Sequence, residues 1–349
     1  MRIMFVYWAF EDQGSGLLIN GYTQAAKELG HEVVVYGRPI KNIPLNYSMD
    51  VESADALVYI FEWTTDLLGG DNLDFVRLSK IARRRTVILD GDGNYNDLVS
   101  AEGDYNHRDQ ASLDKWISIC DSLSDKICQP TFHPLRTNVR TFLFYSYNPQ
   151  WEVPLANRNK ELGVVYVGHS KFRWRALSRV LAAIEPVRNR VGRIGVVGHG
   201  WNALPAWAVP MKMEDAYYTD TNYMRTLGVE ALPPIPFQQV IPWMSKGYLN
   251  PILSRPTFMR LRIVTPRFFE TPAANTFPVF NLDDAYVKEI YGESAKDLVL
   301  PETNAHEKIT DMLDRPDHYA AIVHDIRCRL KKHHSHKQRL KELIDIIEA

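Results

Sequence analysis

The chain has 349 residues, an ordinary 45% share of hydrophobic residues and a formal net charge of −1. This length suits two domains of typical size, and the near-neutral charge argues against strong nonspecific binding to nucleic acid. No apolar run approaches the ~20 residues that span a bilayer, and the N-terminal segment does not have the pattern of a signal peptide. Three cysteines without a paired spacing indicate a reducing compartment, so we expect a cytoplasmic protein.

The charge is unevenly distributed along the chain. Residues 1–150 carry 14 Lys and Arg against 20 Asp and Glu, whereas the remainder carries 27 against 22. A positive second half suits a diphosphate site, although two lobes of opposite charge that attract each other would give the same pattern.

Apolar, β-branched runs predict strands in the first half at residues 3–7, 32–36, 56–61, 86–89 and 126–129. Helical periodicity lies between most of them and is clearest over 17–29, where Gly30 supplies the stop. Strands that alternate with helices predict a parallel sheet covered on both faces.

The pattern restarts after a polar, proline-containing linker at 147–160, with strands expected at 164–167, 193–197, 248–253 and 278–281 and a helix at about 174–184. We therefore predict an α/β protein of two Rossmann-like domains facing across a cleft, an N-terminal domain (1–155) and a C-terminal domain (156–349). The second domain should contain an aromatic, proline-rich insertion at about 203–236 and should end in helices at 305–313 and 319–347.

Gly14 and Gly16 lie between the first strand and the first helix, where backbone amides can meet an anion or a sugar. The dinucleotide fingerprint is incomplete, because Ile19 stands where the third glycine belongs and Gly37 and Arg38 replace the acidic end of the second strand. These departures disfavour an NAD(P) dehydrogenase.

Two glycine turns follow strands of the second domain. The first contains Gly168, His169 and Lys171 and leads to Arg173, so its cations can neutralise a diphosphate leaving group; the alternative is a solvated basic helix start. The second turn consists of Gly198, His199, Gly200 and Trp201, which can approach a nucleotide closely and border its base. A tryptophan buried in the core is the alternative for Trp201.

Polar residues also follow the fourth strand of the first domain. The run 90–97 resembles the start of a calcium loop but has Tyr95 and Ala101 at positions six and twelve, so we expect no metal there. Asp92 and His107 are instead candidates for a catalytic base or for orienting an acceptor hydroxyl, with capping or turn roles as the alternative.

Arg267 and Glu270 stand three residues apart before a short apolar strand. Arg267 can fork onto phosphate oxygens while Glu270 accepts hydrogen bonds from sugar hydroxyls; a surface ion pair at a helix start is the alternative.

With these residues in view, the second half resembles GT-B glycosyltransferases, most closely the CgeB-like group related to spore-maturation proteins. The stretches 167–169, 198–201, 249–250, 267–273, 291–293 and 334–340 carry the resemblance. It implies that Glu270 binds the ribose of a nucleotide-sugar and that Arg267 and Gly168 lie by its diphosphate. It also implies that Gly198 to Trp201 border the base, and that Asn275 takes a turn position where the family usually has glycine. Arg262 occupies the place of the first of two glutamates found in many retaining relatives.

We therefore expect a metal-independent glycosyltransferase without a bound cofactor. Its donor is a nucleotide-sugar, and its acceptor is an unspecified small molecule, glycan, protein or modified nucleic acid. One alternative is an enzyme that glycosylates modified bases of DNA, with Arg255, Arg260 and Arg262 as part of its footprint. A noncatalytic protein of the same fold that binds nucleotide-sugars or glycans is a second.

Overall fold

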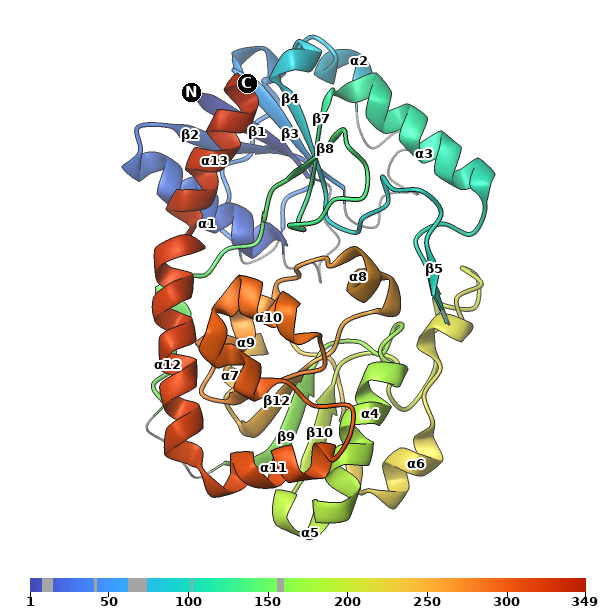
Figure 1. Ribbon diagram of the computed structural model, residues 1–349. Helices are drawn as coiled ribbons and strands as arrows, with labels where there is room; N and C mark the ends of the chain where they lie inside the picture. Colours follow the sequence, from blue (N-terminus) through green and yellow to red (C-terminus); the bar gives the residue numbers. More distant parts are fainter. Residues whose placement is uncertain (8–14, 41–42, 62–73, 102, 156–159) are drawn as a thin grey trace.

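The structure is a computed structural model that describes residues 1–7, 15–40, 43–61, 74–101, 103–155 and 160–349. Two parallel β-sheets, each accompanied by helices, form an upper and a lower domain (Figure 1). The expected class, α/β with two Rossmann-like domains, is confirmed.

The first sheet has six parallel strands in the order β2-β1-β3-β4-β7-β8. These strands are β1 (Arg2–Val6), β2 (Glu32–Tyr36), β3 (Ala56–Phe61), β4 (Thr86–Asp90), β7 (Lys126–Gln129) and β8 (Val139–Thr141). The helices of this domain are α1 (Ser15–Glu28), α2 (Phe75–Leu78) and α3 (Gln110–Leu123). Short 3-10 turns lie at Val51–Ser53, Arg83–Arg85 and Pro149–Trp151. A small hairpin, β5 (Ser100–Ala101) and β6 (Asp104–Tyr105), projects toward the lower domain (Figure 1).

The second sheet has five parallel strands in the order β11-β10-β9-β12-β13. They are β9 (Leu162–Val167), β10 (Ile194–Val197), β11 (Val229–Leu232), β12 (Gly247–Ile252) and β13 (Phe277–Phe280). The accompanying helices are α4 (Trp174–Ile184), α5 (Arg188–Val191), α6 (Thr221–Thr226), α7 (Val240–Met244), α8 (Pro256–Leu261), α9 (Arg267–Ala273), α10 (Asp284–Tyr291) and α11 (Ala305–Asp314). Single 3-10 turns occupy Glu185–Val187, Asp215–Tyr217 and Phe237–Gln239, and a longer 3-10 helix covers Glu293–Leu298.

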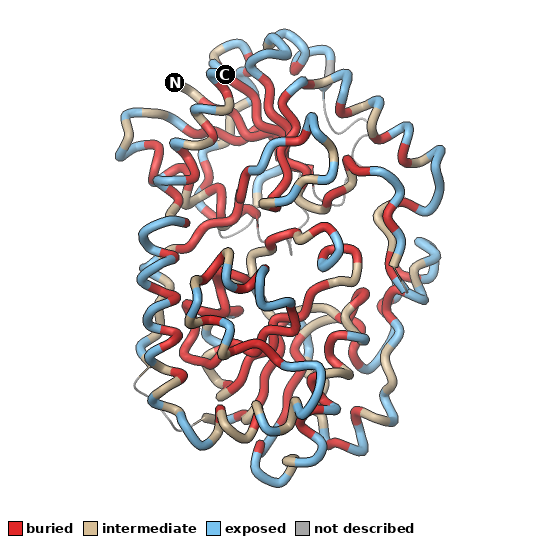
Figure 2. Tube along the Cα trace, viewed as in Figure 1, coloured by how far each residue is buried: buried red, intermediate tan, exposed pale blue. Residues whose placement is uncertain are grey.

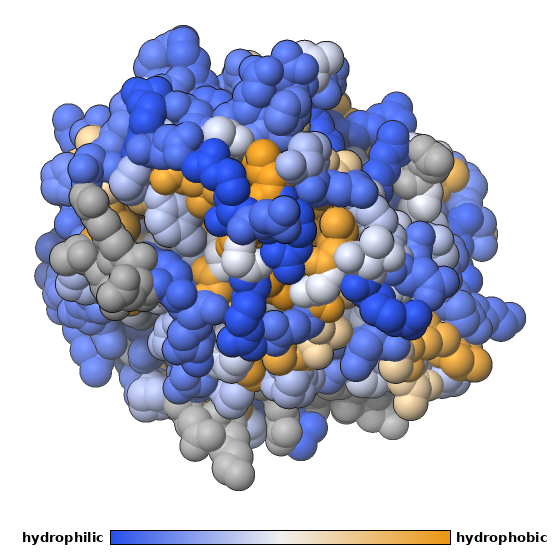
Figure 3. Space-filling view, turned by 90° about the horizontal axis from the view of Figure 1, so that it is seen from below, coloured by the Kyte–Doolittle hydropathy of each residue, from blue (hydrophilic) through white to orange (hydrophobic). Residues whose placement is uncertain are grey.

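Burial follows the sheets. The strands are mostly buried, whereas exposed residues lie on the outer turns and helix faces (Figure 2). Nearly continuous apolar strands such as β3 and β9 are expected where helices cover both faces of a parallel sheet. Seen from below, the lower domain presents mainly hydrophilic side chains with several separate apolar patches (Figure 3).

The last two helices connect the domains. Helix α12 (Pro316–His333) runs along the lower domain, and α13 (His336–Glu348) continues onto the upper domain, where it packs against α1 (Figure 1). The segment that leaves the first domain meets the junction of α12 and α13, where the backbone N–H of Tyr147 donates to the His334 carbonyl over 2.8 Å. All C-terminal helices are expected in the second domain, whereas α13 packs on elements of the first.

Two further expectations differ from the structure. The single helix expected over 319–347 is broken, because the Ser335 side chain accepts a hydrogen bond from the backbone N–H of Gln338 and begins a new helix there. The expected insertion at 203–236 contains regular structure in its second part, since α6 and β11 lead into the edge of the sheet.

Candidate functional site

The candidate site lies where the strand order of the second sheet reverses. The chain runs outward from β9 to β10 and β11, then returns to the other side of β9 with β12 and β13. In open parallel sheets, ligands bind beside the carboxyl ends of the strands at such a switch point. The segments that follow β9, β10 and β12 meet at this edge and supply its side chains.

The two glycine turns pack against each other. The Gly168 N–H donates to the Val197 carbonyl over 2.8 Å, and the Ser170 N–H donates to the His199 carbonyl over 2.9 Å. Gly198 has a positive φ of 143°, and a Cβ added to it would lie 2.4 Å from the Gly168 carbonyl oxygen. Glycine is therefore required at position 198, because any side chain would separate the turns.

Four cations gather beside the first turn. Lys171, Arg173, Arg255 and Arg267 all act on His169, whose pKa is well below its ordinary value because of burial and because of these charges. Burial is also the main reason that the pKa of Lys171 falls to about 7, with Arg255 adding to the effect. Such an accumulation of positive charge in a buried place suits an anion with several charges.

Arg267 connects the end of β9 to helix α9. Its Nε donates to the Val167 carbonyl over 2.9 Å, and its Nη1 contacts the Glu270 carboxylate. The side chains are 21% and 8% exposed respectively. The pair is therefore fixed at the strand edge and is not the exposed surface ion pair considered as the alternative.

The first domain brings an acidic loop toward these cations. Asp92 is close enough to favour the charged form of Lys171. The loop is held by buried Asp90, which accepts hydrogen bonds from the backbone N–H groups of Asn94 (3.0 Å) and Tyr95 (2.7 Å). Burial raises the pKa of Asp90 to about 6. Asp90 thus positions the loop, while Asp92 approaches the site.

His107 does not share this position. Its ring is 6% exposed and its Nε2 lies 3.0 Å from the Asn94 carbonyl, to which it can donate. Burial lowers its pKa, which favours the neutral ring. This contact with the loop is the one expected of the turn role considered as the alternative, and the catalytic role of His107 stays a prediction.

The two domains touch through helix α8. A Cβ on Gly93 would lie 2.8 Å from the Leu261 side chain, and Val99 packs in one apolar cluster with residues of α8 and the segment after it. The Thr131 hydroxyl donates to the Leu261 carbonyl over 2.9 Å. Loops at the carboxyl edge of the first sheet therefore rest directly on the second domain.

Several predicted residues lie elsewhere. Trp201 is fully buried and donates its indole N–H to the Gly168 carbonyl over 2.7 Å. It therefore packs against the first turn as a core residue, which is the alternative considered for it. Gly16 lies at the start of α1 in the first domain, as expected, and a Cβ there would meet the Ile40 side chain at 2.6 Å. Its contact with a ligand stays a prediction. Asn275 takes a turn position by the resemblance, but it is absent from the positive-φ residues of the described chain, so its backbone is not one that would need glycine.

The roles expected of His199 and Gly14 stay predictions. The His199 ring lies at the end of β10, 5.0 Å from the ring of half-exposed Trp207, in an edge-to-face arrangement. Gly14 lies outside the described residues.

Two residues of this edge, Arg255 and Asp104, are not among the predicted site residues. Arg255 is predicted only as part of a possible DNA footprint, yet it is one of the four cations beside the first turn. The other two arginines of that footprint lie elsewhere: Arg260 donates to the Ser100 carbonyl, and Arg262 lies 3.7 Å from Asp283. Asp104, which pairs with Arg255, was not noted at all. The position of Arg255 just after a predicted strand was the available signal; nothing in the sequence marks Asp104.

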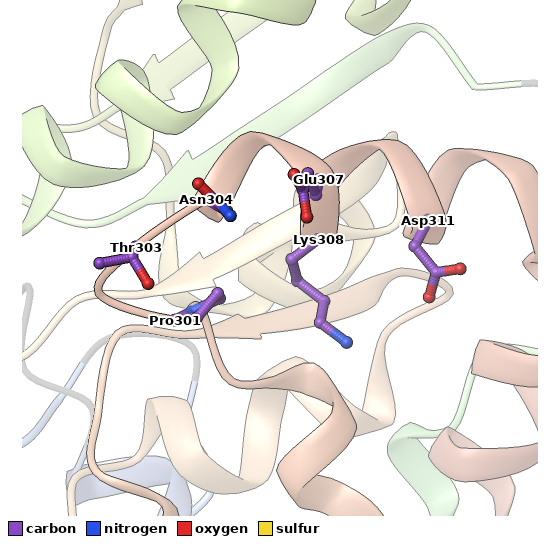
Figure 4. Close-up of a pocket in the computed structure, with 6 residues that line it drawn as sticks. All are labelled: Pro301, Thr303, Asn304, Glu307, Lys308 and Asp311. Carbon is purple, nitrogen blue, oxygen red and sulfur yellow. The ribbon is translucent and has the colours of Figure 1, made fainter.

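A different hollow, of about 410 Å³, lies on α11 at the bottom of the lower domain (Figures 1 and 4). Lys308 and Asp311 line it, but both also bond to the Tyr319 hydroxyl, at 3.3 and 2.5 Å. These charges therefore have partners already, and the hollow is separate from the cation edge.

Comparisons with known proteins bear on the fold of the chain. Residues 175–345, just under half of the chain, match the model of a family described as glycosyl transferase-like. An alpha-glucosyltransferase solved with UDP and a 13-mer DNA aligns over the whole of both chains, with a TM-score of 0.65 and 13% identity. T4 phage beta-glucosyltransferase also aligns over the whole of both chains, and a mutant of it in complex with UDP-glucose gives a TM-score of 0.59 and 13% identity. For the complex of this enzyme with UDP and Mn²⁺, the TM-score is 0.59 and the sequence identity is 14%.

No curated protein matches the chain in sequence. At such low identities the likeness to the solved structures establishes the fold, which is that of GT-B glycosyltransferases. Within the chain, the match to the glycosyl transferase-like family model is confined to the second half. Within the described ranges, no helix is long and apolar enough to cross a membrane.

Proposed function

We propose that the protein transfers a sugar from a nucleotide-sugar, bound at the carboxyl edge of the second sheet, to an acceptor held by the first domain. The observation that carries this proposal is the gathering of Lys171, Arg173 and Arg267 beside two closely packed glycine turns at the switch point of the sheet. A nucleoside diphosphate has the charge and shape that such an edge can hold.

The cations then have a catalytic role as well as a binding role. Negative charge develops on the diphosphate as the sugar departs, and fixed donors aimed at that charge stabilise the transition state more than the ground state. Arg267 is fixed by Val167 and Glu270, and Arg173 donates to the Lys171 carbonyl over 2.6 Å. Glu270 is proposed to accept hydrogen bonds from the ribose and, through its contact with the Arg267 guanidinium, to orient Arg267.

Asp92 is our candidate for the group that accepts a proton from the acceptor hydroxyl. It is half-buried on a loop anchored by Asp90 and acts on Lys171 across the domain boundary. A carboxylate held opposite the leaving group is suited to general base catalysis. His107 is proposed only to hold this loop, and His199 is proposed to border the nucleotide.

The transferase is proposed to work without a metal ion, since the cations can supply the charge that a metal would contribute. T4 phage beta-glucosyltransferase has been solved with Mn²⁺, so this part of the proposal needs its own test. Membership of the CgeB-like group, a cytoplasmic location and the nature of the acceptor stay predictions. We do not extend the proposal to DNA, because the three arginines of the suggested footprint contact other parts of this chain.

Calorimetric titration with UDP, GDP, dTDP, CDP and ADP, with and without Mn²⁺, tests the donor site. We expect micromolar binding of one nucleotide without metal. Glu270→Ala and Arg267→Ala should each weaken it by about 10- to 100-fold, because each removes charge-assisted hydrogen bonds. Glu293→Ala is the matched control, since Glu293 only pairs with Lys288 and Lys296 on the exposed surface.

If the wild-type protein binds none of the five nucleotides under either condition, the donor-site proposal is wrong. Binding that requires Mn²⁺ would overturn metal independence alone. Slow hydrolysis of the matching nucleotide-sugar should accompany binding, whereas its complete absence would favour a noncatalytic binding protein.

A further inference from the structure

The hairpin β5–β6 carries a buried carboxylate from the first domain into the second. Asp104 has no exposed side-chain surface and accepts four hydrogen bonds from the second domain. Two come from Arg255, at 2.6 Å from Nη2 and 3.3 Å from Nε, and two from Thr257, at 3.0 Å from the backbone N–H and 2.5 Å from the hydroxyl. A buried carboxylate with this many donors is held in one position.

Arg255, the partner of Asp104, also packs against two aromatic rings. The Arg255 guanidinium lies 4.6 Å from the ring centroid of Phe172 and 4.7 Å from that of Phe258. Tyr105, the next residue of the hairpin, packs edge-to-face on the same Phe172 ring at 5.7 Å. Phe172 directly follows Lys171 and has a left-handed backbone with a φ of 56°, which a phenylalanine keeps only where its surroundings impose it.

We infer that Asp104 is a positioning residue for the diphosphate end of the donor site, through Arg255 and through the segment that carries Lys171. This inference rests on the proposed function. The first domain, by way of its hairpin, holds two cations of the second domain at the switch point. The donor site is then complete only while the hairpin is docked.

Charge alone would have the opposite effect. Removing a carboxylate from a cluster of cations makes the cluster more positive, so an anion should bind more tightly if Asp104 contributed only its charge. If Asp104 positions Arg255, its loss should weaken binding. Because Asp104 also favours the charged form of Lys171, the comparison is made at a pH well below the pKa of Lys171, where the amine stays protonated. Under that condition the sign of the change in affinity separates the two roles.

The test is a titration of Asp104→Asn with UDP, or with whichever of the other four nucleotides the wild type binds. Asparagine keeps the shape and one acceptor but loses the charge-assisted pair with Arg255. We expect binding about tenfold weaker, a typical size for coupling between two sites. Arg255→Lys keeps the positive charge but not the two-pronged contact, and should weaken binding as well.

The pH dependence of binding supplies a second readout. Asp92 and Asp104 favour the charged form of Lys171, whereas Arg255 and Arg173 disfavour it. Losing the Asp104 charge lowers the pKa of Lys171, so the loss of affinity at alkaline pH should begin at a lower pH in Asp104→Asn. A purely structural defect would not shift this midpoint.

Glu289→Gln is the matched control, because it weakens another contact between the domains, the 2.8 Å pair of His133 and Glu289, which lies outside the cation cluster. Unchanged or tighter binding by Asp104→Asn would overturn the inference. If that variant does not fold, unchanged affinity in Arg255→Lys overturns it. If the wild type itself binds no nucleotide, the proposed function has failed, and this inference fails with it.

Discussion

Lys171 is a cation whose charge depends on the protein around it. It is only 6% exposed, and burial, reinforced by Arg255, brings its pKa to about 7. A bound diphosphate favours the protonated amine, so affinity should be greatest below pH 7 and should fall as pH rises through this pKa, by at most about tenfold per pH unit. Titration with UDP-glucose between pH 6 and 9 measures this pH dependence of the affinity, since the diphosphate of UDP-glucose loses no proton in that range.

The matched variant is Lys171→Arg. Arginine stays charged throughout this pH range, so its binding curve should be flat even if its affinity differs from the wild type. A curve for the wild type that is equally flat would show that Lys171 either keeps its proton or does not contact the donor.

Single residues also show where sequence reasoning reaches its limit. The pattern of glycine followed by cations after a strand was enough to place Gly168, Lys171 and Arg173 at one edge. It could not distinguish Trp201 from a ligand-facing aromatic, because burial depends on what packs over a residue. Asp104 was invisible, since its partner lies 151 positions away in the chain.

Helix α9, which carries Arg267 and Glu270, is held at its far end by a buried arginine of α12. Arg327 donates from Nε to the Pro272 carbonyl over 2.7 Å, and from Nη2 to the carbonyls of Ala273 and Ala274 over 3.1 and 2.9 Å. These carbonyls have no partner within the helix, as at any helix C-terminus. The arginine therefore stabilises the element that presents the proposed donor contacts.

We expect Arg327→Met to lower the free energy of unfolding by about 3 kcal/mol, because it leaves buried carbonyls without this donor. Urea unfolding measures the loss, and a nucleotide titration should show weaker binding as α9 shifts. Arg329→Met is the control on the same helix. Arg329 is exposed, and its carbonyl contacts are long, at 3.3 and 3.4 Å. An equal loss in both variants would contradict the anchoring role.

Periodicity predicted most elements of both sheets to within one or two residues, because apolar β-branched runs are distinctive when a strand is buried on both faces. It missed β11, whose short run is followed directly by two prolines that suggested an irregular insertion. It also joined α12 and α13, although Ser335 and Gln338 have the spacing of a capping box and so signalled a new helix.

Because α13 packs on the first domain, the stability of that domain depends on residues 336–348. Leu340, Leu343 and Ile347 are buried on α13, and the Lys126 Nζ donates to the Ile347 carbonyl over 2.7 Å. Leu343→Ala should therefore destabilise the protein by about 3 kcal/mol, as expected for a core leucine. Lys341→Ala, on the exposed face of the same helix, should be nearly neutral.

Urea unfolding with separate probes for the two domains checks this prediction. A loss of stability confined to the second domain would contradict the placement of α13. The amphipathic pattern of the helix showed that one face is buried, but it could not show which domain buries that face. The sequence was thus enough to predict two domains, but it was not enough to predict that the last helix, α13, packs on the first domain.

This arrangement has a consequence for the order in which the protein takes shape during synthesis. The second domain is built from one continuous stretch, so a ribosome can deliver everything its sheet needs before α13 emerges. The first domain begins earlier but receives α13 only after the whole second domain has been translated. Newly made chains should therefore leave an apolar face of α1 uncovered for the longest time, and that face is where a chaperone would bind them.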